Sequence, residues 1–187
     1  MRGDRRGRLM MNQVKNPTVY PKKIAARKRG NSIDAYVKTR LKRKSALLSP
    51  IYKRYKSCID PWINQVINRP AFAVCDQVVF NHEQGYAGTL DVVCDLPDWG
   101  MTVVNIKTCA FKIFPEAIES ALLQTAAYRA AWNSCHCALR TNAIAAVFIS
   151  PYGLTVEARI GNDVERYTQQ FYQRCRQFAA AHNASSA

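Results

Sequence analysis

Two neighbouring apolar stretches of this chain carry polar side chains of the kinds that hold a metal ion and activate water. Asp91 lies within the first stretch, and Asn105 and Lys107 stand two residues apart in the second. Side chains alternate along a β-strand, so Asn105 and Lys107 are expected on one face, and an adjacent strand is expected to bring Asp91 onto that same face. Mg²⁺ prefers hard oxygen ligands, and a bound metal acidifies water. The three residues therefore predict a site for metal-assisted hydrolysis, with the lysine orienting or polarising the attacking water.

Each of these residues, taken singly, also fits a simpler interpretation. Asp91 can be a surface or turn acid on a half-exposed strand, and Lys107 can be an exposed strand lysine. The joint pattern is more specific, because a glycine-containing approach from Gly85 precedes the acid and a helical stretch follows the lysine.

The elements that must position these residues follow from the hydrophobic periodicity. Alternation with a period of two predicts strands at 71–80, 85–96, 101–108, 143–150 and 154–160. Apolar residues at three- and four-residue steps predict helices at 24–48, 115–133 and 162–182, with a short helix after Pro61. The expected fold class is α/β, with a mixed central sheet flanked by helices.

Positive charge is concentrated in the first third of the chain. Residues 1–56 hold 18 of the 27 Lys and Arg residues and only two acids, Asp4 and Asp34. A solvated basic tail that aids solubility is one interpretation, but clusters such as the one at 42–44 favour a polyanion, and nucleic acid in particular. We therefore expect residues 1–23 to form a basic flexible arm, residues 24–187 to form a single domain, and DNA to be the partner.

The chain has no run that approaches the roughly 18 apolar residues of a membrane span, and no apolar stretch follows its first arginines. We expect an intracellular protein with no membrane association. A bacterial or phage-infected cytoplasm suits it better than the mitochondrion, because the Arg-rich start is explained as well by a DNA-binding arm as by a transit peptide.

Four segments in order resemble the RecB-like branch of the PD-(D/E)XK nucleases. The family patterns G-Y-x-G-x-x-D, D-x-K-T and Q-x-x-x-Y correspond here to residues 85–91, 105–108 and 124–128. Upstream, residues 29–34 resemble the R-G-x-x-x-H start of a helix, with Asp34 where the family has histidine. The chain looks most similar to the mitochondrial genome maintenance exonucleases and related phage and bacterial exonucleases, and the resemblance covers about residues 26–178.

The resemblance implies a restriction-endonuclease-like core with one Mg²⁺ or Mn²⁺ site. It assigns catalysis to Asp91, Asn105 and Lys107, and metal ligation to Asp91, Asn105, Ile106 and Asp34. Residues that support the site or contact DNA would be Gln124, Tyr128, Arg29 and Lys112. Asp76 lies near a position where the family often carries an acid. Phe111 and Phe114 either flank a DNA strand or pack in the core. The implied function is a metal-dependent DNA exonuclease that acts on single-stranded ends in recombination, repair or phage DNA metabolism.

Two departures from the family pattern bear on activity. Asn105 stands where the family has an acid, so the site loses a charge, and the sequence leaves open whether the amide is native or introduced. Asp34 replaces a neutral histidine and would restore the carboxylate count if it lies close to Asp91. The alternative function is a weakened or inactive DNA-binding protein on the same fold, including a viral genome-binding component. An Asn105→Asp chain is expected to cut DNA better than the chain with asparagine.

Overall fold

The computed structural model describes residues 19–68 and 73–184, which form one α/β assembly. Four α-helices and two short 3-10 helices accompany five strands in the described part of the chain. The helices are α2 (Val19–Leu41), α3 (Lys53–Ile67), α4 (Pro115–Cys135) and α5 (Asn162–Ala184), with η1 (Pro50–Tyr52) and η2 (Cys137–Leu139). The strands are β1 (Val74–Asn81), β2 (Tyr86–Leu96), β3 (Gly100–Thr108), β4 (Ala143–Ser150) and β5 (Gly153–Ile160). The predicted mixed sheet flanked by helices is confirmed.

The five strands form one sheet in chain order, β1-β2-β3-β4-β5. The pairs β1–β2, β2–β3 and β4–β5 are antiparallel, whereas β3 and β4 are parallel. The parallel pair needs a crossover connection, and α4 supplies it. The crossover carries the polypeptide from the end of β3, where Lys107 lies, directly into the helix that contains Gln124 and Tyr128.

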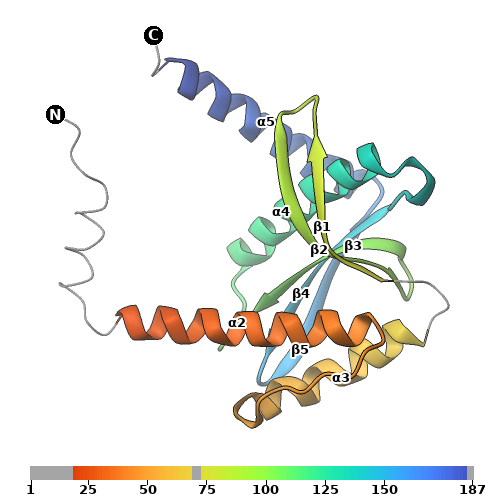
Figure 1. Cartoon of the computed structure of the whole chain (residues 1–187). Coiled ribbons are helices and arrows are strands. Elements are labelled where there is room, and N and C mark those ends of the chain that lie inside the picture. The colour runs from red at the N-terminus through yellow and green to blue at the C-terminus, as the bar shows by residue number, and fades with distance from the viewer. Residues whose placement is uncertain (1–18, 69–72, 185–187) are drawn as a thin grey trace.

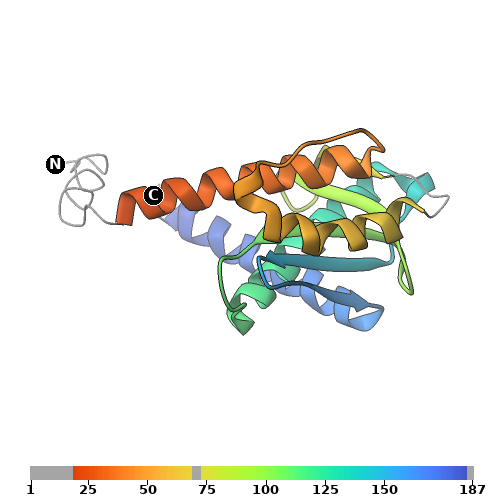
Figure 2. The ribbon, with the colours of Figure 1, turned by 90° about the horizontal axis from the view of Figure 1, so that it is seen from below.

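The sheet separates two helical layers. In Figure 1, α2 and α3 lie in front of the sheet and α4 lies behind it, and Figure 2 shows α2 and α3 packed side by side. One core joins α2 and α3 to the sheet residues Val92, Val104 and Val147. The opposite face packs Ala146 and Phe148 against α4 and α5. β4 is buried on both faces, which explains its continuous apolar sequence.

The observed boundaries differ from the expected ones at two places before the sheet. α2 begins at Val19, so residues 19–23 belong to a helix and not to the expected flexible arm, whose residues 1–18 lie outside the described part of the chain. The expected end of this helix at residue 48 is wrong, because α2 ends at Leu41. The helix expected after Pro61 begins at Lys53 and contains Pro61 in its interior. Elsewhere the strand and helix ends lie within a few residues of the predicted ones. No helix in the described ranges is long and apolar enough to cross a membrane.

Candidate functional site

Three carboxylates from three elements converge on the ammonium group of Lys38. Lys38 Nζ lies 2.9 Å from Asp34 Oδ2, 2.7 Å from Asp76 Oδ1 and 3.2 Å from Asp91 Oδ1. Asp34 and Lys38 are one turn apart on α2, Asp76 comes from β1 and Asp91 from β2. The Lys38 residue is only 8% exposed, which is rare for a lysine unless it is paired. These four side chains are called the acid cluster below.

Burial and neighbouring charges shift the pKa values of Asp34 and Lys38 in opposite directions. Burial raises the pKa of Asp34 above its ordinary value, although the hydrogen bond and charge of Lys38 oppose this. For Lys38, burial alone would lower the pKa, but hydrogen bonds to Asp76 and Asp34 and the charge of Asp91 raise it above its ordinary value. Lys38 is therefore a permanent cation in this cluster at neutral pH.

The backbone is distorted where β1 and β2 bring their acids together. Cys75 pairs with Val92 and Gln77 pairs with Leu90, so this register places Asp76 opposite Asp91. Asp76 has a φ of 60°, a left-handed conformation that is uncommon for a residue with a side chain and is unusual within a strand. Like charges directly opposite each other destabilise a strand pair. The Lys38 ammonium offsets this repulsion and stabilises the distorted pair.

Asp91 also completes a backbone hydrogen bond that the sheet lacks. The β2–β3 pairing ends at Val92 and Val104, and beyond it the Asp91 carboxylate accepts a hydrogen bond from the Ile106 N–H at 2.9 Å. Ile106 was expected among the metal ligands, and the contact observed at this residue is the hydrogen bond from its N–H group to Asp91.

Asp91 was expected to share a face of the sheet with Asn105 and Lys107, but its side-chain contacts lie on the other side of the sheet from theirs. Asp91 contacts Lys38 in the α2 layer, whereas Asn105 and Lys107 contact α4 in the opposite layer. The reason is a break in alternation along β2. Leu90 and Val92 stand on either side of Asp91 and would share a face in a regular strand, but they belong to cores on opposite faces. Strict alternation, on which the expectation rested, does not hold at a distorted strand.

Asn105 and Lys107 do point to one side, as predicted, and both contact Gln124. The Asn105 amide Nδ2 donates to Gln124 Oε1 at 2.9 Å, and Lys107 Nζ donates to the same oxygen at 3.0 Å. Gln124 Nε2 in turn lies 3.0 Å from the Tyr128 hydroxyl. The Asn105 residue is only 2% exposed and also donates to the Ala121 carbonyl at 3.4 Å. Asn105 thus acts as a hydrogen-bond donor within a polar chain that runs from Lys107 to Tyr128.

Gly88 leaves the space that Tyr128 occupies. A Cβ atom on Gly88 would lie 2.6 Å from Tyr128 Cε1, closer than real Cβ contacts come. A glycine at this place in β2 lets the α4 tyrosine lie directly against the strand. The second glycine of the segment 85–91 therefore has a packing role that is specific to Tyr128.

A pocket of about 400 Å³ opens beside Lys107 and Gln124. Lys112, Ile113 and Phe114 form part of its wall, and Lys112 is exposed, so two lysines flank this hollow. Phe114 is 62% exposed and Phe111 is 76% exposed. The interpretation of these two phenylalanines as core residues is therefore wrong. Exposed aromatic rings beside cations are typical of surfaces on which nucleic-acid bases stack.

Arg29 lies on α2 with its Nε atom buried and without a hydrogen-bond partner. Its neighbour Gly30 packs close to Thr108, because a Cβ there would lie 3.3 Å from Thr108 Oγ1. The sequence placed Arg29 among the supporting residues, and the structure brings this part of α2 to the end of β3.

The chemistry of the acid cluster fits a hard divalent cation, but its present arrangement holds an ammonium group. Carboxylate oxygens are the ligands that Mg²⁺ and Mn²⁺ favour. In the part of the chain that the structure describes, no group of three His, Cys, Asp or Glu side chains is arranged to hold a metal ion. Of the expected ligands, the structure brings Asp34 and Asp91 together and adds Asp76, and it places the Asn105 side chain with Gln124 instead.

Lys38 was not anticipated from the sequence. Its signal was present, since Asp34 and Lys38 are four residues apart and can pair on one helix face. The sequence could not show that this pair would be buried against two further acids from the sheet, because that depends on the β1–β2 register.

The comparisons with known proteins add no assignment. No family model matches the chain, and the search of curated proteins found no match.

Proposed function

We propose that the protein is a nucleic-acid nuclease of the PD-(D/E)XK type that requires Mg²⁺ or Mn²⁺ and acts on DNA with single-stranded ends. The observation that carries the proposal is the convergence of Asp34, Asp76 and Asp91 on one cation position. Carboxylates from α2, β1 and β2 gather where the β2–β3 pairing ends, and β3 continues from there to Lys107. The resemblance of residues 85–91, 105–108 and 124–128 to the family motifs supports the same assignment.

In this proposal the three aspartates hold the metal after the Lys38 ammonium has moved away. The bound metal would supply Lewis acidity, which lowers the pKa of water and stabilises charge on phosphorus. Lys107 contacts α4, on the other side of β3 from the acid cluster, so it would donate hydrogen bonds to a phosphate oxygen of the strand, while Gln124 fixes the position of its ammonium group. The Gln124 amide is itself fixed by two further hydrogen bonds: its oxygen accepts from Asn105, and its nitrogen donates to the Tyr128 hydroxyl.

The substrate would lie over the pocket that Lys107, Lys112 and Phe114 border. Its phosphates would meet Lys107 and Lys112, and its bases would stack on the exposed rings of Phe111 and Phe114. Stacking without base-edge contacts makes binding tolerant of sequence, which suits an enzyme that processes ends.

A timed digestion of end-labelled single-stranded DNA in Mg²⁺ and in Mn²⁺ tests this proposal. The unchanged chain should release labelled nucleotides, and Lys107→Ala should lower the rate by about 10²–10³-fold, the scale for removal of one catalytic electrostatic interaction. Lys53→Ala is the matched control, because Lys53 is exposed at the start of α3 and does not line the pocket beside Lys107. Equal rates for the two lysine variants would contradict the role of Lys107.

The metal ligands need a separate test. Asp91→Asn keeps an oxygen that can accept the Ile106 N–H and removes the charge, so the fold should survive the change. Mn²⁺ binding, followed by electron paramagnetic resonance, should weaken at least tenfold in this variant. An unchanged Mn²⁺ affinity would remove Asp91 from the metal site.

A second function is favoured by two specific observations. Lys38 already neutralises part of the acid cluster, and Asn105 donates to Gln124 in the place of a metal-binding acid. Both features suit a protein that binds DNA without cutting it. The digestion decides between the two functions: binding without cleavage in either metal, by both the unchanged chain and Asn105→Asp, would establish the second.

A further inference from the structure

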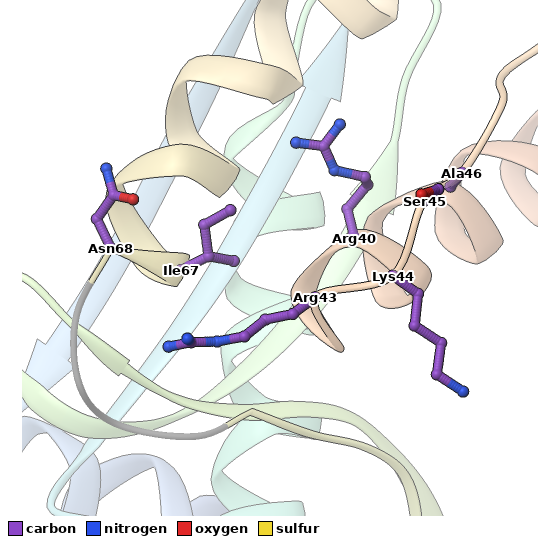
Figure 3. Close-up of a pocket in the computed structure, with 7 residues that line it drawn as sticks. All are labelled: Arg40, Arg43, Lys44, Ser45, Ala46, Ile67 and Asn68. Carbon is purple, nitrogen blue, oxygen red and sulfur yellow. The ribbon is translucent and has the colours of Figure 1, made fainter.

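A second cationic hollow lies at the C-terminal end of α2, and none of the acid-cluster residues lines it. Its volume is about 510 Å³, and it is lined by Arg40, Arg43, Lys44, Ser45, Ala46, Ile67 and Asn68. Three of these residues are cations and none is an acid. The hollow is called the basic pocket below. Figure 3 shows Arg40 and Arg43 extending toward the α3 side of the opening, whereas Lys44 extends the other way.

The basic pocket contains more positive charge than is needed to offset the partial negative charge at the C-terminus of α2. The C-terminus of a helix carries a partial charge of about −0.5, which one nearby cation offsets. Three cations gather here, so the lining is more basic than the helix end alone would call for. Arg40 donates to the Asn64 amide oxygen at 3.4 Å, a neutral partner, so this hydrogen bond does not neutralise the guanidinium group.

The backbone that presents Arg43 is held in a conformation that favours glycine. Arg43 N–H donates to Arg40 O at 2.9 Å and Lys44 N–H donates to Thr39 O at 3.1 Å, the two hydrogen bonds of a Schellman helix end. Arg43 has a φ of 57° at the position of this motif where glycine is preferred. A strained residue that persists at a surface is a reason to look for a function of its side chain. At Arg43, the strain directs a guanidinium group across the pocket.

The basic pocket lies close enough to the acid cluster to hold the same ligand. Lys38 of the acid cluster and Arg40 of the basic pocket are two residues apart in the last turn of α2, a rise of about 3 Å at 1.5 Å per residue. A strand that reaches the acid cluster can therefore place a nearby phosphate in the basic pocket.

We propose that the basic pocket binds a phosphodiester group of the nucleic-acid strand through Arg40, Arg43 and Asn68, away from the position where the strand is cut. Guanidinium groups make paired hydrogen bonds to phosphate oxygens, and the Asn68 amide adds a neutral donor. The inference rests on the proposed function only in that it takes the ligand to be the strand processed near Lys107.

The test measures binding of a fluorescent oligothymidine of 20 nucleotides in EDTA, where no divalent metal is present and nothing is cut. The double variant Arg40→Gln/Arg43→Gly should bind at least tenfold more weakly than the unchanged chain. The slope of log K against log salt should flatten by about 0.7 for each phosphate that the variant no longer binds. Glycine suits the backbone at residue 43, so thermal unfolding of the single variant Arg43→Gly should occur at the same or a higher temperature, which separates weaker binding from weaker folding.

The matched control is Arg174→Gln/Arg176→Gln, which also removes two positive charges from exposed arginines, but on α5. It should change the affinity less than twofold and leave the salt slope unchanged. Equal reductions in affinity in both double variants would overturn the proposal, because they would show a general effect of net charge. Unchanged binding in the pocket variant would overturn it as well.

A second measurement, with inorganic pyrophosphate and thymidine 5′-monophosphate, tests whether the basic pocket binds a nucleic-acid strand or a small phosphate compound. If the pocket variant no longer bound these compounds in calorimetry but kept its affinity for the oligonucleotide, the strand assignment would be wrong. The outcome is also distinct from failure of the proposed function. If DNA binding depends on the basic pocket but no DNA is cut, the nuclease proposal is wrong and this inference holds. If DNA is cut but its binding does not depend on the basic pocket, the nuclease proposal holds and this inference is wrong.

Discussion

Lys38 decides the electrostatics of the acid cluster, because its ammonium group occupies the point on which Asp34, Asp76 and Asp91 converge. A single positive charge faces three carboxylates, so the cluster is under-neutralised even with Lys42 3.6 Å from Asp76. A divalent cation would balance it more fully. A metal must displace the lysine or share its ligands, so the ion pairs that stabilise the metal-free protein also lower its affinity for metal.

Replacing Lys38 with methionine should expose this competition. In metal-free buffer the free energy of unfolding should fall by about 1–3 kcal/mol, less than for a fully buried pair, because the Asp76 side chain is 51% exposed. Mn²⁺ should then raise the Tm of Lys38→Met more than that of the unchanged chain, since binding to the folded state stabilises it. Lys42→Met is the control, and an equal Mn²⁺ response in the two variants would contradict the competition.

Asn105 has a structural role that its place in a motif did not reveal. Its amide donates to two oxygens, those of Gln124 and Ala121, and an aspartate would face both as an acceptor. In metal-free buffer Asn105→Asp should therefore lower the free energy of unfolding by about 2–4 kcal/mol, the cost of a buried charge against unsatisfied acceptors. Denaturant unfolding measures this, with Asn105→Ala as the variant that loses the hydrogen bonds without gaining a charge.

The same substitution tests the catalytic expectation. If the chain with asparagine is a weakened nuclease, Asn105→Asp should increase cleavage of single-stranded DNA by about 10²–10³-fold in Mn²⁺ despite its lower stability. Equal cleavage by the two chains would show that Asp34 or Asp76 already completes the site.

At the scale of elements, periodicity predicted the sheet well because β4 and the centre of β3 are continuously buried and the first half of β2 alternates. The ends of β4 were predicted to the residue, since Pro151 and Gly153 mark the turn that follows it. The acid cluster was predicted only in part. Asp91 was identified from its motif, but its contacts depend on the distortion at Asp76 and Asp91, which no local pattern reports. Lys38 depends on the packing of α2 across the sheet, a contact between residues distant in sequence.

Gly88 and Tyr128 couple β2 to α4, and this coupling can be measured. Gly88→Ala should lower the free energy of unfolding by about 1–3 kcal/mol, the usual cost of overpacking, because the added methyl group overlaps the Tyr128 ring. In the double variant with Tyr128→Ala the alanine at residue 88 should cost little, so the two changes should be strongly non-additive in denaturant unfolding. Additive effects would show that Tyr128 does not limit the size of residue 88.

Asp60 joins α3 to α2 and makes their packing sensitive to acid. Tyr36 OH donates to Asp60 Oδ1 at 2.5 Å, and Lys56 forms an ion pair with the same carboxylate. Burial alone would raise the pKa of Asp60, but the hydrogen bonds from Lys56 and Tyr36 lower it below its ordinary value. A lowered folded-state pKa means that Asp60 contributes stability above the unfolded-state pKa, and that this contribution is lost as the pH falls through the folded-state value.

Asp60→Asn should therefore lower the free energy of unfolding by about 1 kcal/mol at pH 7, within the range for a hydrogen bond to a charged group that is partly exposed. The difference between variant and unchanged chain should shrink below about pH 4, where the aspartate of the unfolded chain becomes protonated. Urea unfolding at pH 7, 5 and 3 measures it. A difference that stays constant over this range would contradict the linkage.

At the scale of the whole molecule, charge and fold are arranged around α2. One face of this helix supplies Asp34 and Lys38 to the acid cluster, and its C-terminal end supplies Arg40 and Arg43 to the basic pocket. The helix thus brings the candidate metal site and the candidate phosphate site into a fixed relation. Residues 1–18 precede it and add five basic residues, Arg2, Arg5, Arg6, Arg8 and Lys15, against one acid, Asp4.

Removing residues 1–18 tests whether this segment contacts the nucleic acid, and the cut spares α2, which begins at Val19. Each phosphate that is no longer bound should flatten the slope of log K against log salt by about 0.7 for single-stranded DNA, because fewer counterions are released on binding. Binding of a labelled oligonucleotide in EDTA at several salt concentrations gives this slope. The length-matched control is the full chain with the same five basic residues changed to glutamine, and it should reproduce the truncation. An unchanged slope in both chains would show that the segment serves solubility alone, and the phosphate contacts would then have to come from the folded part that begins with α2.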